Sequence, residues 1–390
     1  MSSLWPRDLP DELYITYQFD NLRFIGIYPG FSKAPFWQRL GLYVLDLFCV
    51  LQHIAIACDL LEFREDIERF GDDICLLTAF TLVLGKRWFC RFYIDDLLDF
   101  VEQLSLGFDH YRHREQQYVQ QLLSHHRLES LIAYMGRMLS IVLFLAMVAH
   151  GLLSNGFILR AKYPFSTDSF LTCGAVFLSQ MLFDGYSILT IMLVDLFTIL
   201  VLSQLSLHFQ LLSMDFANIG RVLPATVHGP LCRDEAVLAH IRELVLRHQN
   251  LLDFGTQVMK MYDSNLMGQF VASIIVICMS AFELLLAQGN VTLVIRFGMF
   301  MVCTFFQILV WCFFGDLIAQ KSLSICDGIA NCNWIVLDDR QKKDLSFIVM
   351  RAQKPFIIDV YRLFPLTYET FLAILSRSYS MFTVMMEMIE

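Results

Sequence analysis

Charged residues are scarce in this sequence of 390 residues. Only 17% are Asp, Glu, Lys or Arg, whereas soluble domains average about 25%. Hydrophobic residues make up 56%, and the mean hydropathy is +0.54. A single water-soluble core has no need for 35 phenylalanines and 18 methionines. The composition argues against an ordinary soluble domain and predicts an all-α membrane protein with several spans.

Signatures of catalysis, metal binding and nucleic-acid binding are also missing from the sequence. It has no P-loop, HExxH or GxSxG motif. Adjacent histidines point about 100° apart on a helix, so at most one of His125 and His126 shares a metal with Glu129. We expect these three residues on a solvated cytosolic face. The net charge of -9, without a basic run, argues against nucleic acid as a partner. We predict no enzyme activity, metal or cofactor.

Cysteine pairs and a secretory leader are two further absences. The 11 cysteines are scattered, mostly inside apolar runs, and form neither a CxxC cluster nor a disulfide framework. Cys326 and Cys332 are expected in a cytosolic region, where thiols stay reduced. Because Arg7 and Asp8 precede the first apolar run, no cleaved signal peptide is predicted.

Long apolar runs are what the sequence has instead. A helix needs about 20 residues to cross a hydrocarbon core. Seven runs approach this length, at about 37–60, 74–92, 131–153, 171–202, 266–286, 291–318 and 366–389. The second run is basic at its inner end, and the fourth is long enough to continue as a helix through His208 and Leu212. Residues 1–36 are predicted to form a cytosolic segment whose hydrophobic patch, residues 22–28, lies along the membrane.

Lys and Arg gather in alternate connections between these runs. The N-terminal segment and the second-to-third, fourth-to-fifth and sixth-to-seventh connections are rich in them, which assigns these parts to the cytosol. The N-terminus is therefore expected inside and the C-terminus outside. The single glycosylation sequon, at Asn290, falls in a short connection that this topology places outside.

The cytosolic connections are long and amphipathic. Between residues 235 and 262, apolar side chains approximate one stripe of a helix with charges opposite. We expect the fourth, fifth and sixth helices to extend inward and pack against residues 331–364, with Pro365 ending that segment. The predicted organisation is a cytosolic segment (1–36), helices one to six with the ligand-binding bundle (37–330), a cytosolic anchor helix (331–364) and a last helix (365–390).

The last run is unusually polar for a lipid-facing span. Its polar residues are Thr367, Tyr368, Glu369, Ser376, Arg377, Ser378, Tyr379, Ser380 and Thr383. Polar residues in a membrane segment usually face partner helices or water. Two interpretations stay open: a tightly packed interior helix, or a helix that lines an aqueous path.

Two sets of residues inside the other runs are candidates for function. Asp46, Asp184, Asp195 and Glu283 are ionisable residues within spans; each either pairs with a neighbouring helix or borders a cavity or ion path. In the outer halves, aromatic and thioether side chains could enclose a small apolar ligand, with His150 or Tyr186 as a polar handle, although packing alone would also explain them. This second set is Phe80, Met147, His150, Phe183, Tyr186, Phe297 and Phe300.

The C-terminal third holds a spaced set of residues that ends in a distinctive run. The set is Gln307, Cys312, Gly315, Ser322, Trp334, Arg340, Arg351, Pro355, Phe364, Pro365, Leu366, Phe371, Leu375 and the closing run Ser378, Tyr379, Ser380, Met381, Phe382, Thr383 and Val384. In this pattern the chain resembles the insect odorant receptors. The sister gustatory receptors carry a Thr-Tyr…Gln-Phe signature, which Thr367 and Tyr368 begin without the Gln-Phe. A G-protein-coupled receptor or a secondary transporter is a weaker alternative, because the motifs or repeats of those classes are not visible.

The resemblance implies a ligand-gated, non-selective cation channel of four subunits in the plasma membrane of a sensory neuron dendrite. It places an odorant pocket in the outer half of each bundle and the last helices around a central pore. Without a long insertion between the fourth and fifth spans, the chain looks like a tuning subunit that assembles with a shared co-receptor. Alignment on the closing motif places Val384 and Met388 at the gate, where an apolar ring blocks ions by dewetting, and Glu387 near the outer mouth.

Overall fold

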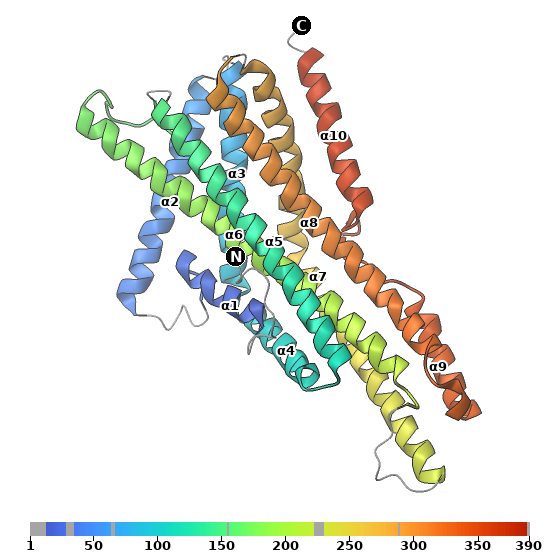
Figure 1. The fold of residues 1–390 in the computed structure, drawn as a ribbon. Helices are drawn as coiled ribbons and strands as arrows, with labels where there is room; N and C mark the ends of the chain where they lie inside the picture. Colours follow the sequence, from blue (N-terminus) through green and yellow to red (C-terminus); the bar gives the residue numbers. More distant parts are fainter. Residues whose placement is uncertain are drawn as a thin grey trace.

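The computed structural model of the chain describes residues 13–28, 35–63, 67–153, 156–221, 230–287 and 289–387. Long helices run side by side in one elongated bundle (Figure 1). The long helices are α2 (Phe36–Glu62), α3 (Ile67–Phe92), α5 (Gln116–Leu153), α6 (Phe170–Ala217), α7 (Pro230–Leu286), α8 (Val291–Ala330) and α10 (Tyr368–Glu387). Shorter elements are α1 (Tyr14–Asn21), η1 (Leu22–Ile25), α4 (Ile94–Arg112), η3 (Trp334–Val336), α9 (Asp339–Ala352), β1 (Asp359–Val360) and β2 (Phe364–Pro365).

Within the described residues, five of the long helices are apolar enough over 18 residues to cross a membrane by composition: α2, α5, α6, α7 and α8. The charges on α3 explain why its sequence is less apolar. Lys86 forms an ion pair with Asp195 of α6, and Arg87 and Arg91 both pair with Asp46 of α2. These pairs neutralise the basic inner end of α3 inside the bundle, which lowers the cost of placing it at membrane depth.

The two ends of the bundle differ in character. The C-terminal end of α10 lies at one end, and α4 and α9 lie toward the other (Figure 1). The distribution of Lys and Arg along the sequence assigns the end with α4 and α9 to the cytosol. Beyond the apolar runs, α6, α7 and α8 continue into this end, as the sequence predicted, and α9 packs against α7 and α8. We call these inner ends together with α9 the anchor.

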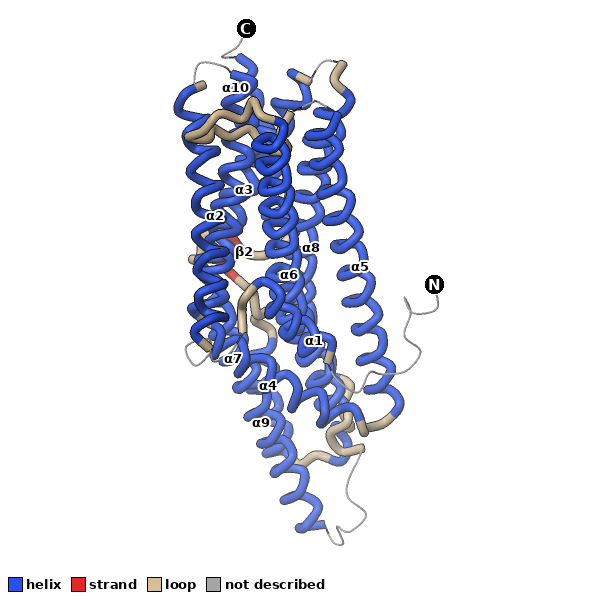
Figure 2. Tube along the Cα trace, turned by 90° about the vertical axis from the view of Figure 1, so that its left-hand side faces the viewer, coloured by secondary structure: helices blue, strands red, loops and turns tan. Residues whose placement is uncertain are grey.

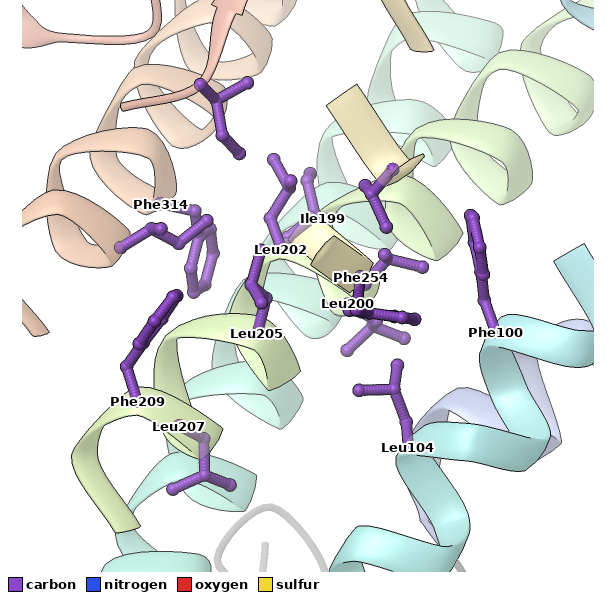
Figure 3. Packing of buried hydrophobic residues seen from close by; sticks show 14 of the residues in the cluster. Phe100, Leu104, Ile199, Leu200, Leu202, Leu205, Leu207, Phe209, Phe254 and Phe314 are labelled. Atoms are coloured by element: carbon purple, nitrogen blue, oxygen red, sulfur yellow. The ribbon is translucent and has the colours of Figure 1, made fainter. Parts of the chain in front are cut away.

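Helix α6 lies at the centre of the bundle. It contacts α1, α2, α3, α4, α5, α7 and α8. Its apolar side chains form one continuous core with those of neighbouring helices (Figure 3). In that core Phe100 of α4 meets Phe254 of α7 edge-on, with ring centroids 5.1 Å apart. The predicted inward continuation of the fourth run is confirmed, since α6 ends only at Ala217.

One prediction near the inner end of the bundle is wrong. His125 and Glu129 are not on a solvated face, because both are buried against α6, where His125 Nδ1 lies 3.3 Å from Ser203 Oγ. The patch of residues 22–28 is partly covered by the chain itself, since Leu22, Ile25 and Ile27 are fully buried beside α6 while Phe24 is 77% exposed. Its position along the membrane stays a prediction. A short apolar patch or a polar pair does not reveal in the sequence which surface covers it.

Burial of His125 and Glu129 against α6 shifts the pKa of both side chains. Gln204 Nε2 donates a hydrogen bond to Glu129 Oε1 at 2.8 Å. Loss of water raises the pKa of Glu129 to about 7 and lowers the pKa of His125 to about 4. Near neutral pH, desolvation therefore favours the uncharged forms of His125 and Glu129 on the inner extension of α5, where the sequence predicts a solvated face.

The segment between α9 and α10 also differs from the expectation. The prediction extended the anchor helix to Pro365, but α9 ends at Ala352. A short antiparallel ribbon follows, in which Val360 pairs with Phe364, and it lies between α9 and α10 (Figure 2). Tyr361 and Arg362 turn the ribbon with φ angles of 49° and 58°. This turn and Pro355, rather than Pro365 alone, separate the two helices.

Candidate functional site

The predicted ligand-binding side chains gather around one apolar cluster between α2, α3, α5 and α6. Phe80, Met147 and Phe183 are buried within it, and Tyr186 and Phe300 pack against it. The rings of Phe80 and Phe183 lie 4.4 Å apart between centroids. Phe48 of α2, which the sequence reasoning missed, meets Phe183 edge-on at 6.3 Å. We call this group the outer cluster.

Phe297 and His150 lie next to the outer cluster. Phe297 is fully buried and its ring centroid is 6.3 Å from that of Phe300. His150 Nδ1 lies 3.1 Å from Thr292 Oγ1, and Thr292 in turn donates to Asn290 Oδ1 at 2.8 Å. The sequon residue Asn290 also caps the start of α8 by accepting from the backbone N–H of Leu293. Its glycosylation stays a prediction.

Both predicted polar handles already have partners within the chain. The Tyr186 hydroxyl donates to the backbone carbonyl of Ile25 at 3.0 Å, and the Arg87 guanidinium lies over the Tyr186 ring. The hydroxyl thus points toward the N-terminal segment, and His150 is engaged by Thr292. A ligand among these aromatic side chains would gain mainly from apolar contact.

Two contacts near the outer end of the bundle were not suggested by the sequence, and the first belongs to the outer cluster. In the connection after α5, Leu159 is fully buried, and its backbone N–H and C=O both bond the side chain of Gln180 at 3.0 and 2.8 Å. Arg296 of α8 makes a bidentate ion pair with Asp72 of α3 at 2.7 and 3.1 Å. Both are tertiary contacts between residues far apart in the sequence.

A cavity of about 120 Å³ lies beside the outer cluster, between α5, α6 and α8. The cavity and the outer cluster share three side chains, those of Leu143, Ile188 and Cys303. Most of its wall is apolar, while Asp195 and Gln307 also line it. The sequence singled out Asp195 but not Gln307 as a site residue. Gln307 could have been identified as a candidate because it is a polar side chain in the middle of an apolar run.

Helix α10 presents a different kind of surface. Thr370, Ile374 and Ser378, four residues apart, form its buried face against the rest of the chain. It packs on α7 and α8, and its first turn is held by Asp316, which accepts a hydrogen bond from the Tyr368 N–H at 2.8 Å. A Cβ at Gly315 would overlap the carbonyl of Leu366, so the small residue there allows the chain to approach α8.

The predicted gate and motif residues fall on or near α10. Tyr379, Ser380, Val384 and Glu387 are exposed, Phe382 and Thr383 are half-buried, and Ser378 is buried. Pro365 lies in β2. Met388 lies outside the described residues. Val384 and Glu387 share the stretch of helix farthest from the anchor.

A family model described as "7tm Odorant receptor" matches residues 66–379. The chain belongs to this family. Putative odorant receptor 92a of Drosophila melanogaster is 28% identical over 192 residues, and odorant receptor 47b of the same species is 23% identical over 372 residues. The matched stretches cover 49% of this chain and 45% of the first relative, and 91% of this chain and 86% of the second.

Solved structures of an insect olfactory receptor share the fold. The receptor OR5 from Machilis hrabei in complex with eugenol has a TM-score of 0.80 to this chain at 15% identity, covering 96% of this chain and 98% of that one. A second structure of the same receptor has a TM-score of 0.78 to this chain at 16% identity, covering 95% of this chain and 97% of that one. The seven-helix membrane fold of this odorant receptor is thereby established, and the receptor class excludes an enzyme.

Proposed function

We propose that this odorant receptor is a tuning subunit of an odorant-gated, non-selective cation channel. In the proposal a small, mostly apolar volatile molecule binds at the outer cluster or the cavity beside it. Four subunits, some of them a shared co-receptor, surround a pore lined by α10. The channel opens to the extent that the ligand binds the open state more tightly than the closed one.

The observation that carries the proposal is the surface of α10. Outside its buried face the helix exposes Glu369, Ser376, Arg377 and Ser380, together with Val384. Charged and hydroxyl side chains are costly against lipid and usually face protein or water. Leu372 and Met381 are exposed beside these polar side chains. A helix that touches its own chain on one face only, with a mixed polar and apolar surface on the others, fits a pore built by several copies.

The apolar environment of the outer cluster supports the ligand assignment. Its aromatic side chains pack at contact distance, and the two polar handles are already engaged. Selectivity should therefore be loose, because each buried methylene is worth only about 0.8 kcal/mol. The likeness to a receptor whose structure was solved with eugenol points to small volatile ligands of this kind.

Three finer assignments belong to the same proposal. The chain lacks a long insertion between its fourth and fifth spans, which favours a tuning subunit over the shared co-receptor. The receptor is located in the plasma membrane, and its class places it in the dendrite of a sensory neuron. Val384 and Met388 form the apolar gate, and Glu387 attracts cations at the outer mouth.

Electrical recording tests the proposal. The chain is co-expressed with an odorant co-receptor, and odorant-evoked current is recorded from excised patches without nucleotide or G protein. Val384→Ala and Met388→Ala should change basal leak or ion selectivity while odorant potency is nearly kept. Phe183→Ala should shift potency with permeation unchanged. A Val384→Ala channel that differs from wild type in potency alone would overturn the gate assignment.

A further inference from the structure

Four polar side chains form a hydrogen-bonded chain across the middle of the bundle. Lys86 of α3 pairs with Asp195 of α6, and Gln307 of α8 donates to the other carboxylate oxygen of Asp195. Gln269 of α7 then donates to Gln307 Oε1 at 2.9 Å. Lys86, Asp195 and Gln269 are buried, and Gln307 is half-buried. We call these four residues the polar bridge.

Two members of the polar bridge also line the cavity between α5, α6 and α8. Asp195 and Gln307 provide a polar patch, and Ser140 adds a hydroxyl. The remaining lining is apolar apart from the Cys303 thiol and includes Leu139, Met192 and Phe306. An apolar pocket with a few convergent polar groups is the usual form of a small-molecule site.

The size and charge of the cavity limit its ligand. A cavity of ~150 Å³ lined by apolar side chains accommodates benzene, so about 120 Å³ suits a molecule with about the six non-hydrogen atoms of benzene. Asp195 accepts hydrogen bonds, and the Gln307 amide both donates and accepts. Lys86 already balances the carboxylate, so a cationic amine would be repelled by Lys86 and a carboxylate by Asp195. A neutral hydroxyl group satisfies both partners without adding charge.

The far end of the polar bridge leads toward the last helix. Gln269 is followed on α7 by Phe270, whose ring meets that of Phe364 edge-on at 6.1 Å. Phe364 belongs to β2, directly before α10, and α10 itself packs on α7 and α8. A change in the hydrogen bonds of Gln307 therefore acts on helices that hold the start of α10.

We propose that the cavity is a subsite for the hydroxyl end of a small neutral alcohol, and that the polar bridge transmits its occupation to α7 and hence to α10. This inference rests on the proposed function for the transmission step only. The binding step concerns the isolated chain and is measured without any current.

Binding is tested on the purified full chain in detergent, by measuring how much each added ligand raises the melting temperature. The two ligands are n-pentanol and n-hexane, which are similar in size but differ in the hydroxyl group. Pentanol should act at about fivefold lower concentration, since a hydrogen bond between its hydroxyl and the uncharged Gln307 amide is worth about that much. Gln307→Met should abolish this preference. Gln210→Met is the matched control, because it removes another glutamine pair, with Gln121 at 2.8 Å, outside the cavity. Equal preference in wild type and Gln307→Met would overturn the subsite.

Gly136→Leu gives an independent test that leaves the polar bridge intact. A Cβ at Gly136 meets only the Phe306 ring, at 3.9 Å, so a larger side chain can grow into the cavity. It should weaken pentanol binding about tenfold or more. Unchanged pentanol binding in Gly136→Leu would overturn the subsite, and this variant decides the question if Gln307→Met does not fold.

Transmission is tested with Gln269→Met, which breaks the polar bridge at α7 without touching the cavity lining. In cells that also express the co-receptor, pentanol binding should persist while the maximal pentanol-evoked current falls severalfold, with Gln210→Met again as control. An undiminished current would overturn transmission. If wild type binds pentanol with the expected preference but carries no current in any ligand, the proposed channel function fails and the subsite stands.

Discussion

Helices α6 and α10 both run along the membrane-spanning bundle, yet they have opposite surroundings. Every side chain of α6 from Leu193 to Leu207 is buried, on all sides of the helix. Helix α10 buries one stripe, through Thr370, Ile374 and Ser378, and exposes Leu372 and Tyr379. This part of α6 is enclosed on all sides within one chain, whereas α10 is enclosed on one face only. The contrast separates the part of the receptor that folds by itself from the part that we expect other subunits to complete.

The largest expected effect comes from opening the core around the inner end of α6. Phe209 is fully buried there, and its ring lies 5.9 Å from that of Phe356. Phe209→Ala should lower the free energy of unfolding by about 3–5 kcal/mol, because it leaves a cavity in a packed core. Thermal unfolding of the purified chain measures the loss. Phe347→Ala, on the exposed face of α9, is the control and should change stability by less than about 0.5 kcal/mol.

The contact between α5 and α6 should show itself in the pH dependence of stability. Burial raises the pKa of Glu129 from 4.5 to about 7. Between pH 4.5 and about 7 the Glu129 carboxyl is protonated in the folded state but ionised in the unfolded state. The folded state is therefore stabilised most below pH 4.5, and this contribution is lost as the pH rises through 7. Relative to Glu129→Gln, wild type should lose up to ~3 kcal/mol across that window.

Chemical denaturation at several pH values measures the difference between the two proteins. His125, whose pKa burial lowers, titrates with the opposite sign but is present in both and cancels. A difference between wild type and Glu129→Gln that stayed constant from pH 4.5 to 7 would show that the carboxyl is hydrated.

A smaller effect should distinguish the two faces of α10. Ile374 lies in the buried stripe, while Leu372 is 62% exposed on the same helix. Ile374→Ala should cost the single chain about 2 kcal/mol through lost packing, and Leu372→Ala less than about 0.5 kcal/mol. Unfolding of the purified subunit in detergent compares them. Equal losses would mean that α10 has no preferred face.

The smallest effect on the single chain is expected at Tyr379, which is 68% exposed. Tyr379→Ala should leave the stability of the isolated chain within about 0.5 kcal/mol of wild type. If neighbouring subunits cover this surface, it should reduce the yield of tetramers with the co-receptor, as seen by mass photometry. Unchanged assembly would indicate that lipid covers this part of α10 and would weaken the contrast with α6.

Repeating patterns along the chain were sufficient for the outline of the fold. They predicted the long helices and the extension of α6 through His208, and they suggested the outer-half side chains Phe80 and Phe183, which the structure brings together. The length of α9 was mispredicted, because the ribbon around Tyr361 depends on contacts with α7. The sequence predicts Tyr186 as a polar handle for the ligand, because nothing near it along the chain reveals that Ile25 accepts its hydrogen bond.

The sequence alone determined the class of the protein, the number of its long helices and the side of the membrane on which each connection is expected. These depend on local composition and periodicity, which a single stretch of chain already contains. Only the tertiary structure decided which charge meets which and what covers each apolar face. Lys86 and Asp195 are 109 residues apart, and their pairing follows from how whole helices pack. A pattern shows that a surface is apolar or charged, but its partner is chosen by the rest of the fold.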